Sequence, residues 1–443
     1  MSVKVEDLKS EDKPANISQK GKNCLKSFCS FKTVVIIICV GLVVEQIVSC
    51  IQKLVDRPIT TYTHFDFNKT IAYPSITFCR EPPYKQDKLQ DYGLYAHPRF
   101  TSMWRNFNFS SISLDELWED ITYNDTEFFV QYGLDHLRDN VILTPVTGFV
   151  MGRCYTMSPK VMGTIARATQ NSGYSVTLRH AAADMVNPIS ILPPGYHVHV
   201  HYVREPYTEV EVYNGGLVDY LYINTGETVS VKLKVDEYLM ISGNDDPCTN
   251  RLNYSANACT TKYVSDMVSR TVGCSGPWME SDLPYCNNFE DMTKLISSYI
   301  NFYQNHECDE CPRFCRSYLY NCFVTDRQKY YIWDPDTSEE ARLQTQFYIH
   351  FNNMMVSVYE ERYNYDWNLF LSDLGGSVGF LLGLSVIGLI NIIEKIWIKI
   401  IIPMISKKIQ KDGANNTSNT ADVDIISKPE DTRTDQRNGN RVA

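Results

Sequence analysis

The sequence predicts an α+β membrane protein in which two transmembrane helices flank a large extracellular domain that is rich in β-strands and disulfides. Two long apolar stretches lie towards the two ends of the 443-residue chain. Ten of the 14 cysteines lie between these stretches. Apolar and polar residues alternate with a period of two in residues 191–241 and 345–360, which is typical of half-buried strands.

The first apolar stretch, residues 33–55, is long enough to cross a membrane. At roughly 1.5 Å per residue it reaches about 34 Å, which spans the hydrocarbon core. A signal peptide is the alternative, but a polar tail precedes the stretch and no small-residue cleavage site follows it. The second stretch, from Trp367 to Ile402, is longer than one crossing requires. We therefore expect part of it to project from the membrane or to break.

The second stretch also carries many small residues. Gly375, Gly379 and Gly383 recur every four positions, so on a helix they lie near one face. Small residues let helix backbones approach closely in lipid, where no hydrophobic drive favours association. One carboxylate, Asp373, lies at the outer end of the stretch. Burying a charge in a membrane is costly, so a carboxylate at this place is expected to have a function. The pattern predicts a span that packs against copies of itself around a polar path.

Charges around the two stretches predict the topology. Lysines precede the first stretch and follow the second, so both termini are expected in the cytosol, with the loop outside. The expected location is the plasma membrane, as a multi-pass protein. The predicted parts are a cytosolic tail (1–32), a transmembrane helix (33–55), an extracellular cysteine-rich domain (56–366), a second transmembrane helix with the pore (367–402) and a cytosolic tail (403–443).

Cysteines and glycosylation sequons agree with an extracellular loop. An even number of cysteines confined to one compartment is typical of a disulfide framework. The ten cysteines of the loop are Cys79, Cys154, Cys248, Cys259, Cys274, Cys286, Cys308, Cys311, Cys315 and Cys322. The sequons of the loop, which we expect to be glycosylated, are Asn68, Asn108, Asn124 and Asn253.

Several function classes have no support in the sequence. The net charge is −10 and no basic stripe indicates nucleic acid binding. The chain has no Gly-x-Ser-x-Gly elbow, no His-Glu-x-x-His and no phosphate loop, so we expect neither an enzyme nor a cofactor. Glu45, within the first stretch, is expected to face a wet cavity or the membrane interface rather than to contact permeating ions.

Three histidines share one face of a predicted strand, at His197, His199 and His201. Such a set suggests a metal site or a pH-sensitive face. However, residues four apart on a strand are roughly 13 Å apart, so one ion cannot bind all three. We expect ordinary packing and no metal.

Five motifs in order resemble the degenerin/epithelial sodium channel family, and within it the invertebrate pickpocket and peptide-gated branch. They are Tyr-Pro-Ser-Ile-Thr-Phe-Cys at 73–79, Gly-Arg-Cys-Tyr-Thr at 152–156, the strand at 195–201, Cys308 with Cys311, Pro312 and Cys315, and the helix with Ser372-Asp373-Leu374-Gly375-Gly376 and Gly383-Leu384-Ser385. The resemblance runs from the first apolar stretch to the end of the second. Two family features are missing. The His-Gly pair of the family's cytosolic tail is absent, and its nearest match is Lys20-Gly21. Asn391 stands where the family usually has an acidic residue at the inner mouth.

The resemblance implies a homo- or heterotrimeric, sodium-selective, amiloride-sensitive cation channel whose ectodomain has a palm, thumb and finger. It implies that Asp373 forms a ring at the outer mouth, that Gly383, Leu384 and Ser385 form the selectivity belt, that Ser372 is the degenerin gating position and that Gly379 belongs to the blocker site. It also implies the disulfides Cys79–Cys154, Cys248–Cys315, Cys259–Cys311 and Cys274–Cys286, with Cys308–Cys322 as the remaining pair.

Two other classes share part of this layout. An ATP-gated channel also has two spans and ten extracellular cysteines, but it needs clustered lysines, which are not evident here. A scavenger-receptor-like lipid-binding protein shares the disulfides and glycosylation, but has no need for a small-residue span. The gating stimulus stays open between protons, peptides, small molecules, force and constitutive activity.

Overall fold

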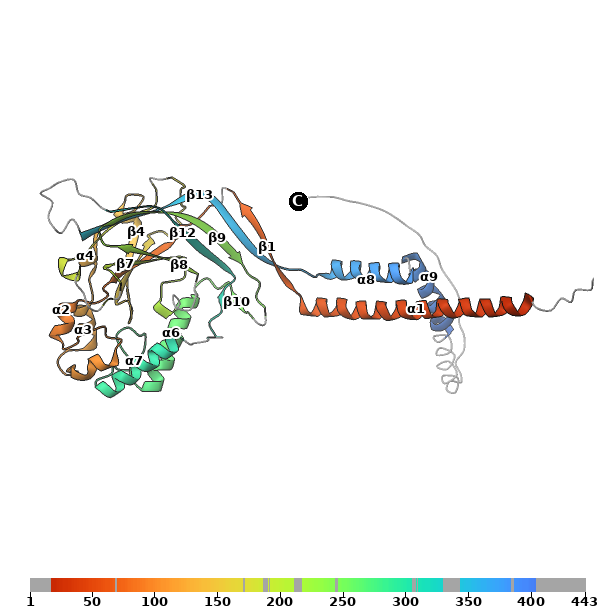
Figure 1. Cartoon of the computed structure of the whole chain (residues 1–443), viewed down its shortest axis with the longest axis horizontal. Coiled ribbons are helices and arrows are strands. Elements are labelled where there is room, and N and C mark those ends of the chain that lie inside the picture. The colour runs from red at the N-terminus through yellow and green to blue at the C-terminus, as the bar shows by residue number, and fades with distance from the viewer. Residues whose placement is uncertain are drawn as a thin grey trace, which may run out of the picture. The chain divides into compact units, whose positions relative to one another are not determined.

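The computed structural model describes residues 17–67, 70–169, 172–185, 190, 192–210, 217–243, 246–304, 308, 310–329, 343–383 and 386–403. The chain forms two compact units, one made of residues 1–58 with 365–443 and the other of Ile59–Asn364. We call them the membrane unit and the ectodomain and describe each by itself (Figure 1).

A mixed six-stranded sheet is the larger of the two main sheets described in the ectodomain (Figure 1). Five of its strands lie in the order β12-β9-β13-β6-β3, and the sixth, β1, pairs with the C-terminal half of β13. β13 is parallel to β9 and antiparallel to β6 and β1. The strands are β1 (Ile59–Asp66), β3 (Phe129–Leu134), β6 (Tyr174–Arg179), β9 (Glu227–Leu239), β12 (Arg316–Lys329) and β13 (Gln344–Tyr363).

A second, antiparallel sheet of five strands has the order β4-β5-β2-β7-β8. These strands are β2 (Ser75–Glu81), β4 (Val141–Thr147), β5 (Arg153–Pro159), β7 (Gly195–His201) and β8 (Val218–Asn224). Side chains of both sheets form one hydrophobic core, in which the Phe78 ring of β2 meets the Phe347 ring of β13 edge-on, with centroids 5.7 Å apart. The period-two alternation of β9 is explained by burial of one of its faces, whereas β2 and β7 are buried on both faces.

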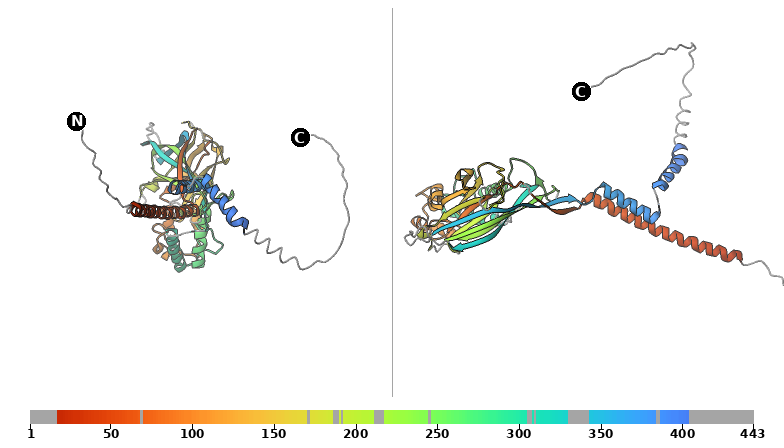
Figure 2. Two further views of the ribbon diagram at one scale, coloured as in Figure 1. Left: turned by 90° about the vertical axis from the view of Figure 1, so that its right-hand side faces the viewer. Right: turned by 90° about the horizontal axis from the view of Figure 1, so that it is seen from above.

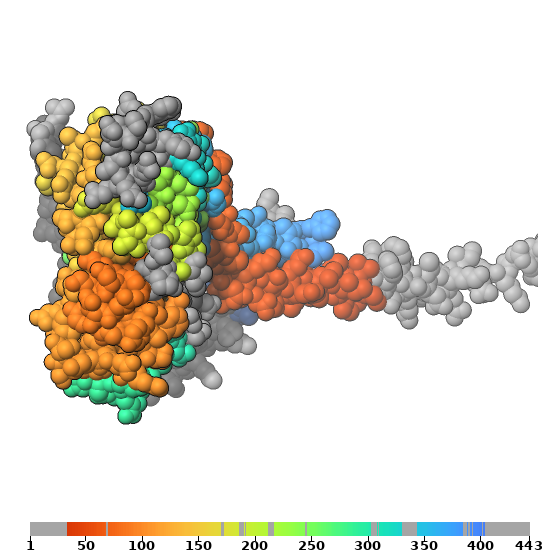
Figure 3. Space-filling view, turned by 60° about the vertical axis from the view of Figure 1, so that its left-hand side comes forward, coloured from red at the N-terminus to blue at the C-terminus, as the bar shows by residue number. Residues whose placement is uncertain are grey.

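Helices enclose a second hydrophobic core, centred on Trp104, Trp118, Phe149 and Trp278. Figure 3 shows the segment near residue 100, in orange, beside the segment near residue 290, in blue-green. Ser113 caps α3 by a capping box, in which the serine and Glu116 satisfy each other's backbone N–H groups. The helices are α2 (Gln86–Asp91), η1 (Thr101–Asn106), α3 (Leu114–Ile121), α4 (Asp125–Phe128), η2 (Arg138–Asn140), η3 (Ala182–Met185), α6 (Ala256–Val272) and α7 (Phe289–Gln304).

The four disulfides of the ectodomain are four of the five pairs that the resemblance implies. They are Cys79–Cys154, which joins β2 to β5, together with Cys248–Cys315, Cys259–Cys311 and Cys274–Cys286. Three of them brace the region of α6, α7 and the short parallel strands β10 (Cys248–Thr249) and β11 (Arg313–Phe314). Crosslinks of this kind stabilise a fold mainly by restricting the unfolded chain.

The prediction of a Cys308–Cys322 disulfide is wrong. The carbonyl of Cys308 accepts a hydrogen bond from the N–H of Cys311, so Cys308 lies at the Cys311 end of the braced region. Cys322 lies seven residues beyond Cys315, and the chain between them is extended and includes the first half of β12. At about 3.3 Å per residue, Cys322 is therefore roughly 23 Å from Cys315. The two Cα atoms of a disulfide must lie within about 7 Å.

Peptide mapping without reduction should therefore find no peptide that joins Cys308 to Cys322. Burial, followed by the nearby Asp219 carboxylate, raises the pKa of the Cys322 thiol well above its usual range. A thiol reacts as its thiolate, so Cys322 should resist maleimide in the native protein and react after unfolding. Rapid native labelling of Cys322, or a mapped Cys308–Cys322 peptide, would contradict this assignment.

The membrane unit contains α1 (Ile17–Asp56), α8 (Trp367–Leu382), α9 (Val386–Ile396) and the π-helical turn η5 (Trp397–Ile401). Within the described residues, one segment, Thr33–Asp56 of α1, is long and apolar enough to cross a membrane as a single helix. The second apolar stretch breaks, as its length predicts. α8 ends at Gly383, and Figure 2 shows α9 leaving the direction of α8 there.

Candidate functional site

α8 begins with a side-chain cap. The carboxylate of Asp366 accepts a hydrogen bond from the N–H of Leu369 at 2.8 Å, which satisfies one of the unpaired donors of the first turn. The cap fixes the first residue of the helix, and so places Ser372 and Asp373 in its second turn. Both of these side chains are exposed in the single chain.

A polar cavity of about 380 Å³ lies between α1 and α8. Serine, glycine and thiol groups leave the space open, because their side chains are too short to fill it. Its lining residues are Gln46, Ser49, Cys50 and Lys53 of α1, and Ser372, Asp373, Gly376 and Ser377 of α8. The structure thus brings the predicted gating serine and the predicted mouth carboxylate to one cavity.

Asp373 has a partner that the sequence analysis missed. The hydroxyl of Tyr365 donates a hydrogen bond to Oδ2 of Asp373 at 3.1 Å. Tyr365 is 8% exposed, and the ammonium of Lys53 lies 5.9 Å from the centre of its ring. A hydrogen bond from a buried hydroxyl orients the carboxylate without neutralising it. No spacing rule links these residues, because Tyr365 precedes the helix and Lys53 belongs to another one.

Glycines of α8 leave one side of the helix open. A Cβ atom built at Gly375 or Gly376 would meet no other atom within 4 Å. Gly379, the predicted blocker residue, lies one turn further along the same helix and is half-buried. The single chain therefore offers an α8 surface that another helix can approach closely.

Gly383 ends α8 in the left-handed conformation, with φ 63° and ψ 22°. Glycine adopts this conformation at little cost, which makes it a frequent helix terminator. The last carbonyl groups of a helix have no intrahelical partner, so the break exposes oxygens that can bind a cation. Leu384 and Ser385, the other predicted belt residues, lie outside the described residues.

Other predicted residues lie apart from this site. Glu45 is exposed on α1. Asn108, Asn124 and Asn253 are exposed on the ectodomain, as glycosylation requires, whereas Asn68 lies outside the described residues. The amide oxygen of Asn124 caps α4 by accepting from the N–H of Glu127, which leaves its amide nitrogen for a sugar.

The three histidines are buried in β7. His197 binds Glu81 and Tyr220, at 3.2 and 3.0 Å, and His201 binds Thr77 and the carbonyl of Glu205, at 2.9 and 2.8 Å. Both ring nitrogens of His199 have no hydrogen-bond partner within the described part of the chain. Its ring packs against the rings of Tyr207 and Tyr220 instead. These hydrogen bonds and ring contacts account for the burial of the set, and the described residues include no cluster that could hold a metal ion.

These histidines should make the ectodomain less stable in acid. Burial, followed by His197 and His201, lowers the pKa of His199 to about 3, and burial lowers that of His201 to about 4. An unfolded histidine has a pKa of about 6.5, so the unfolded chain binds more protons below that pH. The stabilisation is complete above about pH 6.5 and is lost as the pH falls towards 4. The loss is at most about 1.4 kcal/mol per pH unit for each histidine.

His199→Phe should keep the ring packing and flatten this pH dependence. The measurement is the unfolding midpoint of the purified chain between pH 7.5 and pH 4.5, with His64→Phe as the control, since His64 is half-buried on β1. Equal pH slopes in wild type and His199→Phe would show that His199 does not carry the effect.

This fold and site define a class of membrane channel in which a disulfide-braced ectodomain is attached to a broken helix of small residues. The chain belongs to the amiloride-sensitive sodium channel family, whose model matches residues 30–394. Comparison with curated proteins gives no match. Among solved structures, a proton-activated chloride channel is similar at 6% identity and a TM-score of 0.34, over 80% of this chain and 92% of that one. A likeness this weak does not bear on ion selectivity.

Proposed function

We propose that the chain is a subunit of a trimeric, sodium-selective, amiloride-sensitive cation channel that is gated through its ectodomain. The observation that carries the proposal is the break of α8 at Gly383, which follows the oriented carboxylate of Asp373 along the same helix. A carboxylate at the mouth attracts cations, and exposed backbone oxygens beyond it can replace hydration water.

The trimer is supported by the open glycine surface of α8, which needs a neighbour of its own kind. A homo- or heterotrimer would place copies of Asp373 around one axis. In this arrangement α1 and the α8–α9 segment both cross the plasma membrane, with both termini in the cytosol. The lysines at the two ends of the chain support this topology.

Expression of the chain in oocytes tests the function. We expect an inward current that disappears when sodium is replaced by a large organic cation and that amiloride blocks. A chain that reaches the surface and carries only chloride current would contradict the proposal. Because subunits of such a channel can require partners, the same recording with co-expressed relatives from the same source separates a missing partner from a missing function.

A further inference from the structure

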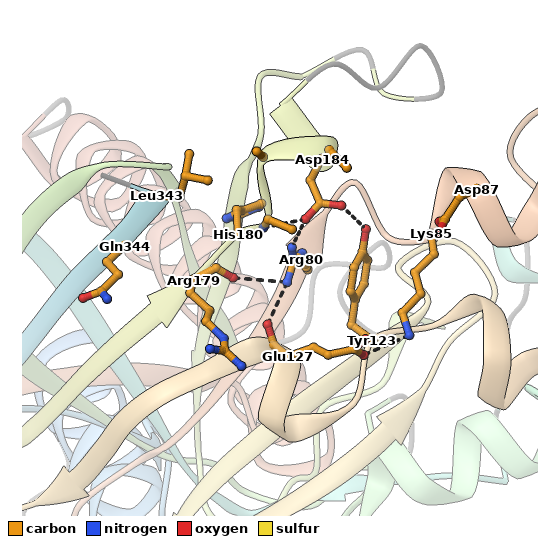
Figure 4. Close-up of a pocket in the computed structure, with 13 residues that line it drawn as sticks. Arg80, Lys85, Asp87, Tyr123, Glu127, Arg179, His180, Asp184, Leu343 and Gln344 are labelled. Carbon is orange, nitrogen blue, oxygen red and sulfur yellow. Dashed lines mark hydrogen bonds and ion pairs between the residues drawn. The ribbon is translucent and has the colours of Figure 1, made fainter. Parts of the chain in front are cut away.

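A cavity of about 520 Å³ lies in the ectodomain, where β2, α4, β6 and the start of β13 come together (Figure 4). This volume is in the range of small-molecule sites. Its charged lining residues are Arg80, Lys85, Asp87, Glu127, Arg179 and Asp184. The apolar part of the wall consists of Leu343, the ring of Tyr123 and the three alanines at 181–183.

Two of the three cations and two of the three carboxylates are already paired. Arg80 is 2% exposed and forms an ion pair with Asp184, which also accepts a hydrogen bond from the hydroxyl of Tyr123 at 2.8 Å. The ammonium of Lys85 lies 2.9 Å from a carboxylate oxygen of Glu127. These pairs hold the wall together. His180 adds no charge, because burial lowers its pKa well below the usual range.

Arg179 and Asp87 remain without an ion pair among the described residues. The guanidinium of Arg179 donates to the carbonyl of Thr126, a neutral group, and retains further donors. Figure 4 shows Asp87 on one side of Tyr123 and Arg179 on the other. Both side chains are exposed, and the cavity that they share has an apolar wall.

Arg80 supplies a further donor at this cavity. Its Nε atom is buried and has no hydrogen-bond partner in the part of the chain that the structure describes. A buried donor without a partner is costly, and a ligand oxygen would remove that cost. The carboxylate of a ligand near Arg179 could therefore also meet Arg80.

We infer that this cavity binds a small organic zwitterion, with its carboxylate at Arg179, its ammonium at Asp87 and an apolar body along the ring of Tyr123, which lies between them (Figure 4). Such a ligand neutralises both unpaired charges and adds no net charge to a lining that is balanced. A simple anion would be attracted by Arg179 but repelled by Asp87. A simple cation would be attracted by Asp87 but repelled by Arg179.

The cavity also lies at the start of a strand that leads to the pore helix. Arg179 is the partner of Gln344 in the pairing of β6 with β13, and β13 continues to Tyr363, shortly before α8 begins at Trp367. Gln344 itself lines the cavity, so a ligand there lies against the strand through which the ectodomain joins α8. An effect of the ligand on current rests on the proposed function, whereas binding does not.

Calorimetry on the purified full chain in detergent tests the binding. The probes are ω-amino acids of increasing length, from aminobutanoate through aminohexanoate to aminooctanoate, each with its N-acetyl and its amide derivative. We expect at least one zwitterion of the series to bind and both of its blocked derivatives to bind about tenfold more weakly or worse. Absence of binding at every length, or equal binding of the blocked compounds, would overturn the inference.

Two variants assign the ends of the ligand. Arg179→Gln should bind the zwitterion and its amide equally weakly, and Asp87→Asn should do the same for the zwitterion and its N-acetyl derivative. Arg270→Gln and Asp266→Asn, which remove an exposed pair on α6, are the matched controls and should bind like wild type. Loss of binding in the controls as well would show a general charge effect and overturn the assignment.

Oocyte currents then separate the two claims. A zwitterion that binds and changes the current in wild type, but not in Arg179→Gln, would support a gating role for the cavity. Binding without any current from a surface-expressed chain would contradict the proposed function and leave the site intact. Current without binding would contradict the site alone.

Discussion

Replacement of Ser372 by phenylalanine is expected to produce a large resting current. Ser372 lines the cavity between α1 and α8, where side chains are small. Ser372 is exposed in the single chain, so the contact that matters is the one between helices that we propose for the closed trimer. Added volume at such a packed contact costs about 1–3 kcal/mol, and three identical subunits would each contribute this cost to the closed state. A shift of a two-state equilibrium from 1:99 to 99:1 requires about 5.5 kcal/mol, which lies within the roughly 3–9 kcal/mol that three copies of the substitution contribute.

The measurement is the amiloride-sensitive current at rest, compared with the surface amount of protein. Ser372→Ala keeps the site small and should leave the resting current low. Leu371→Phe is the bulk control, because Leu371 is 59% exposed in the single chain and does not line the cavity. If Ser372→Phe reaches the surface in a conducting channel and its resting current equals that of wild type, the gating assignment is wrong.

Local patterns in the sequence were sufficient for most elements of the fold. Strands such as β7 and β9 follow from period-two alternation, and α3 follows from the capping box of Ser113. The length of the second apolar stretch predicted that it would either break or project from the membrane, and α8 ends at Gly383 within it. Each of these features is determined by residues close in sequence, which is why one sequence can predict them.

Contacts between distant residues were not predictable in this way. The Tyr365–Asp373 hydrogen bond depends on the direction in which the chain enters α8, and the Arg80–Asp184 pair joins residues 104 apart in sequence. Pairing the last two cysteines with each other assumed that every extracellular thiol is oxidised. Cys322 instead lies within a strand of the large sheet, opposite Leu233 of β9, where no cysteine faces it.

Asp373→Asn is expected to lower conductance without changing the ratio of sodium to potassium permeability. Asp373 is exposed near the N-terminal end of α8, which the proposed topology places at the outer mouth, where water is available. Its charge is therefore expected to concentrate cations without stripping their hydration. Screening lengths are about 30 Å at 0.01 M salt and about 3 Å at 1 M. The conductance loss should therefore be several-fold at the lower ionic strength and small at the higher one.

Tyr365→Phe is the matched variant for this prediction. It removes the hydrogen bond to Asp373 but keeps the negative charge, so conductance should fall less than in Asp373→Asn. An equal fall in the two variants would mean that orientation of the carboxylate, and not its charge, controls conductance.

Ser385 substitution should have the opposite effect and shift the reversal potential in mixed sodium and potassium. Gly383, two residues earlier, ends α8 and exposes the carbonyls of its last turn, so selection is expected where oxygens replace water around the ion. A ring of charge in water attracts both cations alike, whereas oxygen ligands at fixed spacing distinguish them by size. Bi-ionic recordings on Asp373→Asn and Ser385→Ala decide between these roles. A large change in permeability ratio in Asp373→Asn, with none in Ser385→Ala, would show that selection takes place at the outer mouth and that the break at Gly383 serves only to redirect the helix.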